Sequence, residues 1–271
     1  MGLAHERACG CEDARTLTPT LSLSTERGGS TARKSTMTLI LDGIWGRPWR
    51  FKRFERELAE RCGPAQAYAY NSSGAVSLDE LGATLATWVR KRGEAINVIG
   101  HSMGGLVVRA AHLADPRIAF HRTVFVHTPH HGSWLAYALP LKALRQMRPG
   151  SDFLRRLDQA PWPFPTLAVW CPGDAMILPG SSAKWDKAQE TICCRVPAHS
   201  WPIWSGSFRR RIVDFLAAPD GAANSSPLSP VPGGEGRGEG PVDGDFSPRA
   251  RSLVDSAPHP SLSPAYKGEG K

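Results

Sequence analysis

Residues 98–109 read VIGHSMGGLVVR, an apolar run that meets a glycine-flanked serine and continues with helix-like spacing. A strand that turns at once into a helix is crowded, so the positions two before and two after its central residue must lack bulk. Gly100 and Gly104 meet that requirement around Ser102, and Gly105 lets the helix pack closely on a sheet. The stretch is therefore either a plain glycine turn or a turn that presents a nucleophilic hydroxyl at a helix N-terminus, where the dipole favours negative charge.

Short apolar runs alternate with amphipathic segments on both sides of this turn. We expect strands at 37–42, 66–71, 95–99, 122–127, 165–170 and 190–196, and helices at 47–62, 77–93, 103–114 and 205–218. In the second helix Ser77 is the expected N-cap, Glu80 the capping-box residue and Gly93 the C-terminal stop. Uninterrupted apolar strands that alternate with helices indicate an α/β fold, a mostly parallel sheet with helices on both faces. Functional residues in such sheets follow the carboxyl ends of the strands.

Both ends of the chain differ in composition from its middle. Residues 218–271 are rich in Pro, Gly and Ser, and the segment LSPVPGGEG at 228–236 is echoed by LSPAYKGEG at 262–270. Few large apolar side chains are available there to offset the entropy of ordering, so we predict disorder for 218–271 and for 1–36, and one domain at 37–217. Met37 is the predicted native start, and the alternative is that the tails are linkers or partner-binding arms.

Composition narrows the classes of function. The net charge of +8 comes from dispersed basic residues, and the sequence has no nucleic-acid-binding signature, so nucleic acid is excluded as a partner. The charge then reflects either a solvated positive surface or attraction to anionic substrates and transient contact with membranes. No apolar stretch approaches a membrane span, no secretory signal is present, and the six cysteines form no Cys-x-x-Cys pair. We therefore expect a cytoplasmic protein with reduced thiols, and the oligomeric state stays open.

A serine hydroxyl needs a base to take its proton, and the base needs an acid that orients it. In this type of fold the expected chain order is Ser, then Asp or Glu, then His. Asp174 follows the predicted strand 165–170, and His199 follows the last predicted strand. We predict Ser102 as nucleophile, Asp174 as acid and His199 as base, whereas each partner alone could be an ordinary turn or surface residue.

The other histidines give weaker predictions. His101 is expected to pack beside the serine. His127, His130 and His131 lie close together in HTPHHGS, but no carboxylate or cysteine joins them at ligand spacing in the sequence, so no metal site is predicted.

Acyl transfer develops negative charge on an oxygen, which backbone N–H groups can stabilise. Met103 follows the serine, and Ile44 lies in the turn after the first strand, where Gly43 permits a tight bend. We predict these two amides as the oxyanion hole. Apolar side chains in the surrounding loops are predicted to line an acyl pocket, although ordinary core packing would also explain many of them: Trp45, Trp134, Met176, Ile177 and Trp201.

These motifs together resemble those of α/β-hydrolases of the bacterial serine esterase and lipase type. GHSMGGLVVR is similar to the lipase serine turn, TPHHGSWLA at 128–136 to a segment after the next strand, and PGDAMILPGSS to the acid loop. The resemblance spans about 38–217 and implies the same roles for Ser102, Asp174, His199, Ile44 and Met103. Where the family usually carries His-Gly, this chain carries Asp42-Gly43, which leaves the orientation of the oxyanion loop open.

We therefore expect a minimal α/β-hydrolase without a large cap, acting on small-molecule or lipid esters through an acyl-serine intermediate and without a cofactor. The 37 residues between the predicted strands at 122–127 and 165–170 have room for two short helices only. The alternatives are a thioesterase or amidase of the same fold, and a catalytically silent binding protein, which the Asp42 substitution would favour.

Overall fold

The computed structural model describes residues 36–220 of the 271-residue chain. The predictions of disorder for 1–36 and 218–271 therefore fall almost entirely outside the described residues and stay predictions.

Six strands form one parallel sheet in the order β2-β1-β3-β4-β5-β6. Their bounds are β1 Thr38–Leu41, β2 Ala65–Ala67, β3 Ile96–His101, β4 Phe120–Val126, β5 Thr166–Trp170 and β6 Glu190–Cys193. The central strands β3, β4 and β5 are almost wholly buried. This all-parallel arrangement confirms the α/β fold predicted from the alternation of apolar and amphipathic segments.

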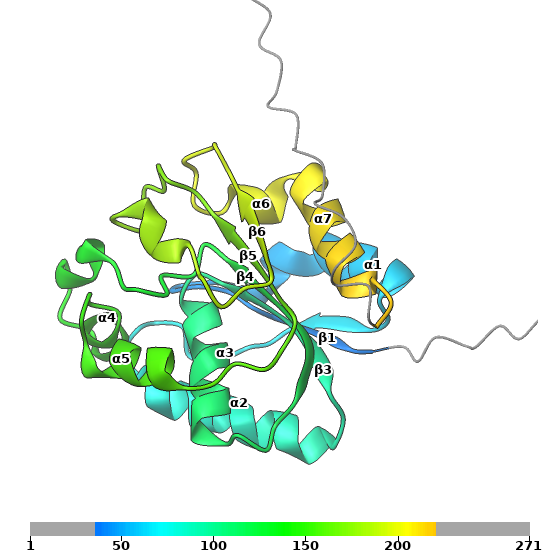
Figure 1. The fold of residues 1–271 in the computed structure, drawn as a ribbon, viewed down its shortest axis with the longest axis horizontal. Coiled ribbons are helices and arrows are strands. Elements are labelled where there is room, and N and C mark those ends of the chain that lie inside the picture. Colours follow the sequence, from blue (N-terminus) through cyan, green and yellow to red (C-terminus); the bar gives the residue numbers. More distant parts are fainter. Residues whose placement is uncertain (1–35, 221–271) are drawn as a thin grey trace, which may run out of the picture. The chain divides into compact units, whose positions relative to one another are not determined.

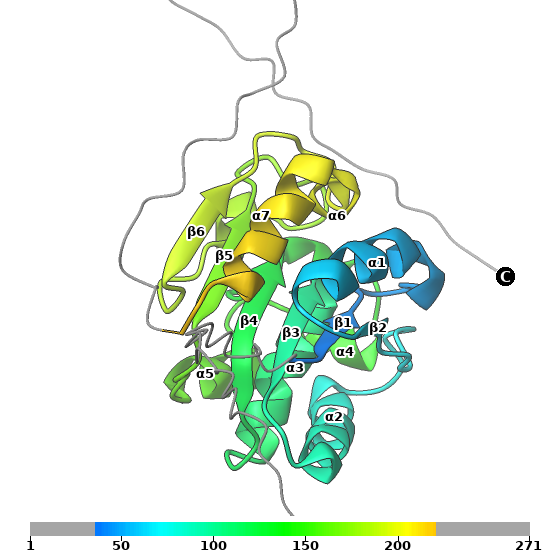
Figure 2. The same ribbon diagram turned by 90° about the vertical axis from the view of Figure 1, so that its right-hand side faces the viewer.

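Helices cover both faces of the sheet (Figures 1 and 2). One face carries α2 Leu78–Arg92, α3 Met103–Ala114, α4 Lys142–Gln146 and α5 Asp152–Gln159. The other carries the 3₁₀ helix η1 Pro48–Phe51 with α1 Lys52–Arg61, α6 Trp201–Trp204 and α7 Gly206–Ala217. Alternate residues of each strand point to opposite faces, so Phe125 joins the first core and its neighbours Val124 and Val126 join the second.

The N-cap and the C-terminal stop of α2 are as predicted. The Ser77 side chain accepts a hydrogen bond from the Glu80 amide at 3.2 Å, and Gly93 ends the helix with a left-handed φ of 68°. Between β4 and β5 the chain forms the 3₁₀ helix η2 Trp134–Tyr137, then α4 and α5, so no large cap is present there. A third 3₁₀ helix, η3 Gly180–Ala183, follows β5. No helix among residues 36–220 is long and apolar enough to cross a membrane.

Every predicted strand differs from the structure by at least one residue at one or both ends. The predicted strand 66–71 stops at Ala67, and the chain then turns so that the Tyr70 hydroxyl donates to the Asp42 carbonyl. The predicted strand 190–196 stops at Cys193. The predicted strand 122–127 begins earlier, at Phe120, and ends at Val126 because His127 takes a φ of 46°, outside the range of extended backbone.

Candidate active site

Ser102 lies in a strained turn between β3 and α3. Its backbone has φ 54° and ψ −127°, a conformation that non-glycine residues rarely adopt and that is held only when the surrounding structure enforces it. Its side chain is 7% exposed and lies at the carboxyl edge of the sheet, at the N-terminus of α3. The predicted turn is therefore present, and the serine sits at its apex.

Close backbone approaches explain the glycines of this turn. A Cβ on Gly100 would lie 2.5 Å from the Gly105 Cα, and a Cβ on Gly104 would lie 2.5 Å from the Leu41 carbonyl oxygen. Both obstacles are backbone atoms, which cannot rotate away. The glycines thus allow β3, α3 and the end of β1 to meet around the serine.

Gly104→Ala is therefore expected to lower the free energy of unfolding by about 2–4 kcal/mol, because the added methyl group must displace the end of β1. Urea denaturation of the purified variant measures this change. The matched control is Gly206→Ala, where the new Cβ would find its nearest neighbours, two arginine side-chain nitrogens, at 3.7 and 3.8 Å. Equal stability of the two variants would contradict this account of the turn.

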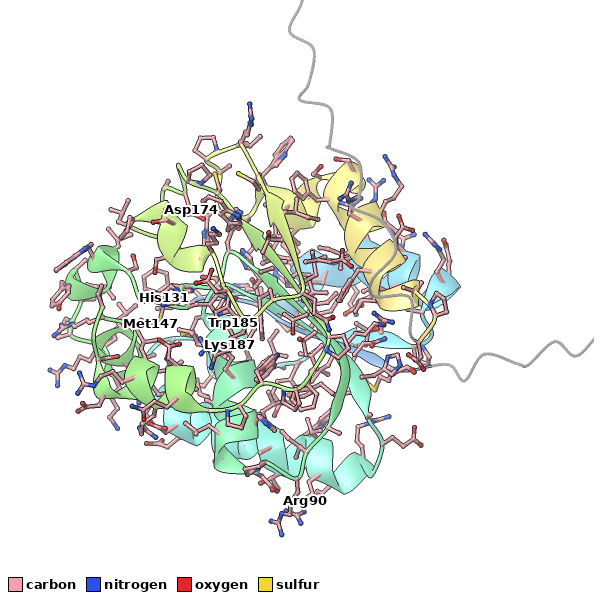
Figure 3. All side chains as sticks on the ribbon, in the orientation of Figure 1. Arg90, His131, Met147, Asp174, Trp185 and Lys187 are labelled. Carbon is pink, nitrogen blue, oxygen red and sulfur yellow. The ribbon has the colours of Figure 1, made fainter. Side chains whose placement is uncertain are left out.

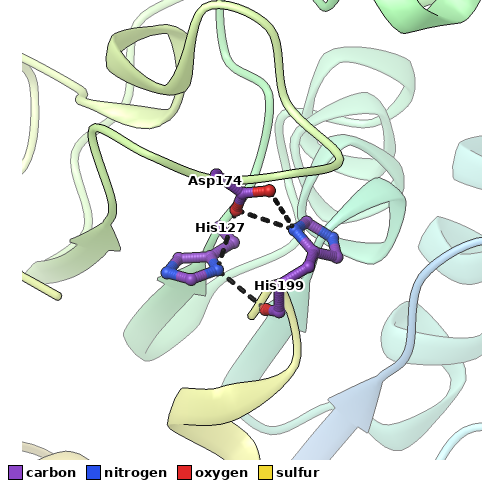
Figure 4. A group of neighbouring side chains, drawn as sticks. All are labelled: His127, Asp174 and His199. Atoms are coloured by element: carbon purple, nitrogen blue, oxygen red, sulfur yellow. Dashed lines mark hydrogen bonds and ion pairs between the residues drawn. The ribbon is translucent and has the colours of Figure 1, made fainter. Parts of the chain in front are cut away.

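Asp174 and His199 lie together beyond the ends of β5 and β6. The Nδ1 of His199 contacts both carboxylate oxygens of Asp174, at 2.8 and 3.0 Å (Figure 4). Asp174 is fully buried at its side chain, and the His199 side chain is 13% exposed. Burial lowers the pKa of His199 more strongly than the hydrogen bond to Asp174 raises it, so the imidazole stays neutral to lower pH than an ordinary histidine.

Four N–H groups surround the Asp174 carboxylate. Its Oδ1 accepts from the amides of Met176 at 2.7 Å and Ile177 at 3.1 Å, and its Oδ2 lies 2.9 Å from the Nδ1 of His127, in addition to the contacts with His199. Burial alone would raise the pKa of Asp174, but the hydrogen bonds from His127 and His199 outweigh burial and lower this pKa well below its usual range. The carboxylate is therefore fixed as an anion with every acceptor site occupied.

The Ser102 side chain faces the loop that follows β1. A Cβ placed on Gly43 would lie 2.7 Å from the Ser102 Cβ and 3.0 Å from its Oγ, so only glycine allows the loop to come this close. Among residues 36–220, no hydrogen bond joins Ser102 Oγ to His199. The structure thus brings Asp174 and His199 into contact and leaves the serine hydroxyl beside Gly43.

Asp42 holds the loop after β1 in place. Its Oδ1 accepts from the Gly43 amide at 2.8 Å and lies 2.9 Å from the His101 Nδ1, and its Oδ2 pairs with Arg50 Nη1 at 3.0 Å. Burial would raise the pKa of Asp42, but the His101 and Gly43 hydrogen bonds and the Arg50 charge lower it below its ordinary value. The other terminal nitrogen of Arg50, Nη2, donates to the Ser200 hydroxyl at 3.0 Å. An aspartate at this position therefore ties the loop to the residue that follows His199.

The two predicted oxyanion amides belong to the residues after Gly43 and after Ser102. Ile44 follows Gly43, and Met103 is the first residue of α3. Within the described part of the chain, neither amide N–H has a hydrogen-bond acceptor. Neither donor is thus engaged by another group of the described chain.

An apolar cavity of about 270 Å³ opens at Ser102. Of the predicted pocket residues, Trp45, Met176 and Ile177 line it, whereas Trp134 stacks on Tyr137 and Trp201 begins α6. Leu144 in α4 and Met147 directly after it also line the cavity and were not predicted from the sequence (Met147 is labelled in Figure 3). The full lining is Ile44, Trp45, Ser102, Pro129, Ser133, Leu135, Ala136, Ala138, Leu139, Leu144, Met147, Met176 and Ile177.

The contacts of the histidines differ from those expected from the sequence. A carboxylate does join one of them, because Asp174 reaches His127, and the ligand-type atoms of His127, Asp174 and His199 all lie within 4.8 Å of one another. These three residues are the set among residues 36–220 that could hold a metal ion. The carboxylate comes from a distant part of the sequence, so the local spacing around His127 did not indicate it. His130 instead stacks on Trp185, with ring centroids 4.6 Å apart. The His101 ring lies 5.0 Å from that of His199.

No protein-family model and no curated protein matches the chain. Among solved structures, it is similar to a monoacylglycerol lipase from Paleococcus ferrophilus, with 16% identity and a TM-score of 0.52 over 67% of this chain and 93% of that one. It is also similar to the propeptide form of the Bacillus licheniformis lipase BlEst2, with 16% identity and a TM-score of 0.56 over 72% of this chain and 53% of that one. With its all-parallel sheet and these neighbours, the chain has the α/β-hydrolase fold.

Proposed function

We propose that this protein is a serine hydrolase that cleaves carboxylic esters, with Ser102 as nucleophile, His199 as general base and Asp174 as the acid that orients it. The observation that carries the proposal is the strained backbone of Ser102, whose hydroxyl lies beside Gly43 at an apolar cavity that Ile44 also lines. Strain of this kind costs about 1–3 kcal/mol and is retained where it aims a reacting group. The resemblance of the surrounding motifs to esterases and lipases supports the same assignment.

The reaction proceeds in two halves. Ser102 Oγ bonds to the acyl carbon while its proton passes to the Nε2 of His199, and the alcohol leaves with that proton. Water then attacks the acyl-serine, gives its proton to His199, and releases the acid as Ser102 recovers its hydrogen. The hydroxyl and the imidazole come into hydrogen-bond reach in the substrate complex, where such contacts tighten. The amides of Ile44 and Met103 bind the oxyanion in each half.

The acyl group of the substrate is apolar in this proposal. The cavity at Ser102 is lined by Ile44, Leu144, Met147 and Ile177 among others, and it has no charged lining residue. An acyl chain there would remove apolar surface from water on both sides of the contact. Several large apolar side chains near the cavity mouth are exposed, including Trp45 at 58% and Met176 at 44%, which suits transient contact with lipid.

A thioesterase of the same fold is the second candidate, because the same oxyanion and acyl pocket would serve a thioester. A catalytically silent binding protein is less well supported, since Asp42 anchors the oxyanion loop instead of leaving it without its usual partner. The cysteines Cys171, Cys193 and Cys194 form no disulfide among residues 36–220, which supports the cytoplasmic location that we propose.

An alkyl fluorophosphonate probe tests the proposal. It should label the wild-type protein at Ser102, as read by mass spectrometry of the labelled peptide, and Ser102→Ala should take no label. Ser207→Ala, in the first turn of α7 on the opposite side of the sheet, is the matched control and should label normally. Folded wild-type protein that takes no label would reject catalysis and favour the binding protein. Hydrolysis rates for matched p-nitrophenyl esters and thioesters then separate the two enzyme candidates.

A further inference from the structure

His127 is a buried histidine that the mechanism above does not use. Its side chain has no exposed surface, and it follows β4 with a left-handed φ of 46°. Its Nδ1 lies 2.9 Å from Asp174 Oδ2 and 2.7 Å from the carbonyl oxygen of His199 (Figure 4). A single ring nitrogen therefore meets both the proposed acid and the backbone of the proposed base.

The partners of this nitrogen fix its protonation. A backbone carbonyl only accepts hydrogen bonds, and so does an ionised carboxylate. Because both neighbours of Nδ1 are acceptors, Nδ1 carries the proton and donates to both. Within residues 36–220 the other ring nitrogen, Nε2, is buried and has no partner.

Two unfavourable features thus meet at one residue. A left-handed backbone at a non-glycine position and a buried nitrogen without a partner both raise the energy of the folded state. An apolar side chain or a glycine at this position would avoid one or both. What histidine adds at this position is the pair of hydrogen bonds from Nδ1. These two bonds therefore account for the presence of a histidine here.

We infer that His127 is a positioning residue that locks Asp174 and His199 into register. The inference rests on the proposed function, since it concerns the same acid and base. β4 is a central strand of the sheet, whereas Asp174 and His199 lie in loops after β5 and the edge strand β6. Through its Nδ1, His127 pins both loops to the interior of the sheet. Asp174 is thereby held by two imidazoles instead of one.

The position offers two informative variants. Asn tolerates a left-handed backbone, and its amide nitrogen can donate where Nδ1 does, so His127→Asn keeps the hydrogen bonds. Gly also accepts this backbone but has no donor, so His127→Gly removes them. The difference between the two variants reports the hydrogen bonds, because neither adds backbone strain.

We expect His127→Gly to lower kcat for a p-nitrophenyl ester by about 10–100-fold with little change in KM, because the acid and base lose their alignment while the acyl cavity stays intact. His127→Asn should recover most of this loss. The matched control is His130→Asn: this residue is also buried, stacks on Trp185 and does not touch Asp174. It should lower the unfolding temperature and leave kcat near the wild-type value.

The pH profile of kcat/KM provides a readout that a purely structural role would not move. The groups that face the His199 imidazole are Asp174, His127 and His101. His101 contacts Asp42, which in turn pairs with Arg50. Without the His127 donor, Asp174 attracts the protonated form of His199 more strongly, which raises the pKa of His199. The acid limb of the profile should therefore move to higher pH in His127→Gly and much less in His127→Asn.

The outcomes separate this inference from the proposed function. If the wild-type protein takes no fluorophosphonate label, the proposed function fails. If the wild type is labelled and His127→Gly keeps both its kcat and the position of its acid limb, only the role of His127 fails. Loss of wild-type activity on dialysis against a chelator, with recovery on adding Zn²⁺, would make His127, Asp174 and His199 a metal site and overturn the inference as well.

Discussion

His199→Ala is expected to lower kcat for ester hydrolysis by about 10⁶-fold, the loss found when the base of a Ser-His-Asp set is removed. The His199 imidazole is the group that Asp174 holds, and burial keeps it neutral to lower pH than an ordinary histidine, so it can accept the Ser102 proton. Among residues 36–220, the other side chain that contacts this carboxylate is His127, which has no exposed surface. Steady-state hydrolysis of a p-nitrophenyl ester and the rate of fluorophosphonate labelling both measure the loss.

The matched control is His121→Ala. His121 lies near the start of β4, at the opposite end of the parallel sheet from Ser102, and its ring contacts Asn97. This variant should keep wild-type kcat. If folded His199→Ala loses less than about tenfold in rate, the base is another group, and His101, whose ring lies 5.0 Å from that of His199, is then the residue to replace.

Asp174→Asn is expected to lower kcat by roughly 10⁴-fold, the scale of this change in a Ser-His-Asp set. The amides of Met176 and Ile177 keep the remaining oxygen in place of Oδ1. The new NH₂ group then stands where Oδ2 was, with its hydrogens directed at the Nδ1 atoms of His199 and His127. Both rings lose an acceptor, and His199 is driven to the tautomer with its proton on Nε2, which cannot take a proton from Ser102.

Asp158→Asn serves as the control, because Asp158 pairs with the buried Arg109 at 2.9 Å and has no contact with the site. It should change the unfolding free energy and leave kcat nearly unaltered. A pH profile adds a second measurement: Asp174→Asn removes the negative charge that raises the pKa of His199, so the acid limb should move to lower pH. An Asp174→Asn variant with wild-type kcat would contradict the role of Asp174.

Much of the fold could be predicted because its signals are local. The helix at Met103–Ala114 has the bounds that the apolar spacing indicated. Ser77 caps the start of the preceding helix with its hydroxyl, and Gly93 ends that helix in a left-handed conformation. The strand ends were less predictable. His127 leaves the strand because its ring reaches Asp174 and His199, which lie far along the sequence. Such a conformation has no signature in the residues next to it.

The proposed site likewise has features that the local sequence predicted and features that it did not. The order of Ser102, Asp174 and His199 after their strands was readable, since the carboxyl ends of parallel strands meet at one edge of the sheet. The lining of the cavity was only partly readable: Trp45, Met176 and Ile177 reach it as predicted. Leu144 and Met147 also line it, although they belong to the buried core and were not predicted. The role of Asp42 was open until Arg50 and His101 were seen to bind its carboxylate.

The sequence by itself determined the alternation of strands and helices, the glycine-lined turn at Ser102 and the chain order of its partners, because each depends on spacing and on the bulk of neighbouring residues. Only the tertiary structure decided which polar atoms meet. The carboxylate of Asp174 receives two imidazoles and two amides, and Asp42 joins the loop after β1 to the region of His199. These contacts link residues brought together by the packing of loops, whose mutual positions no local spacing encodes.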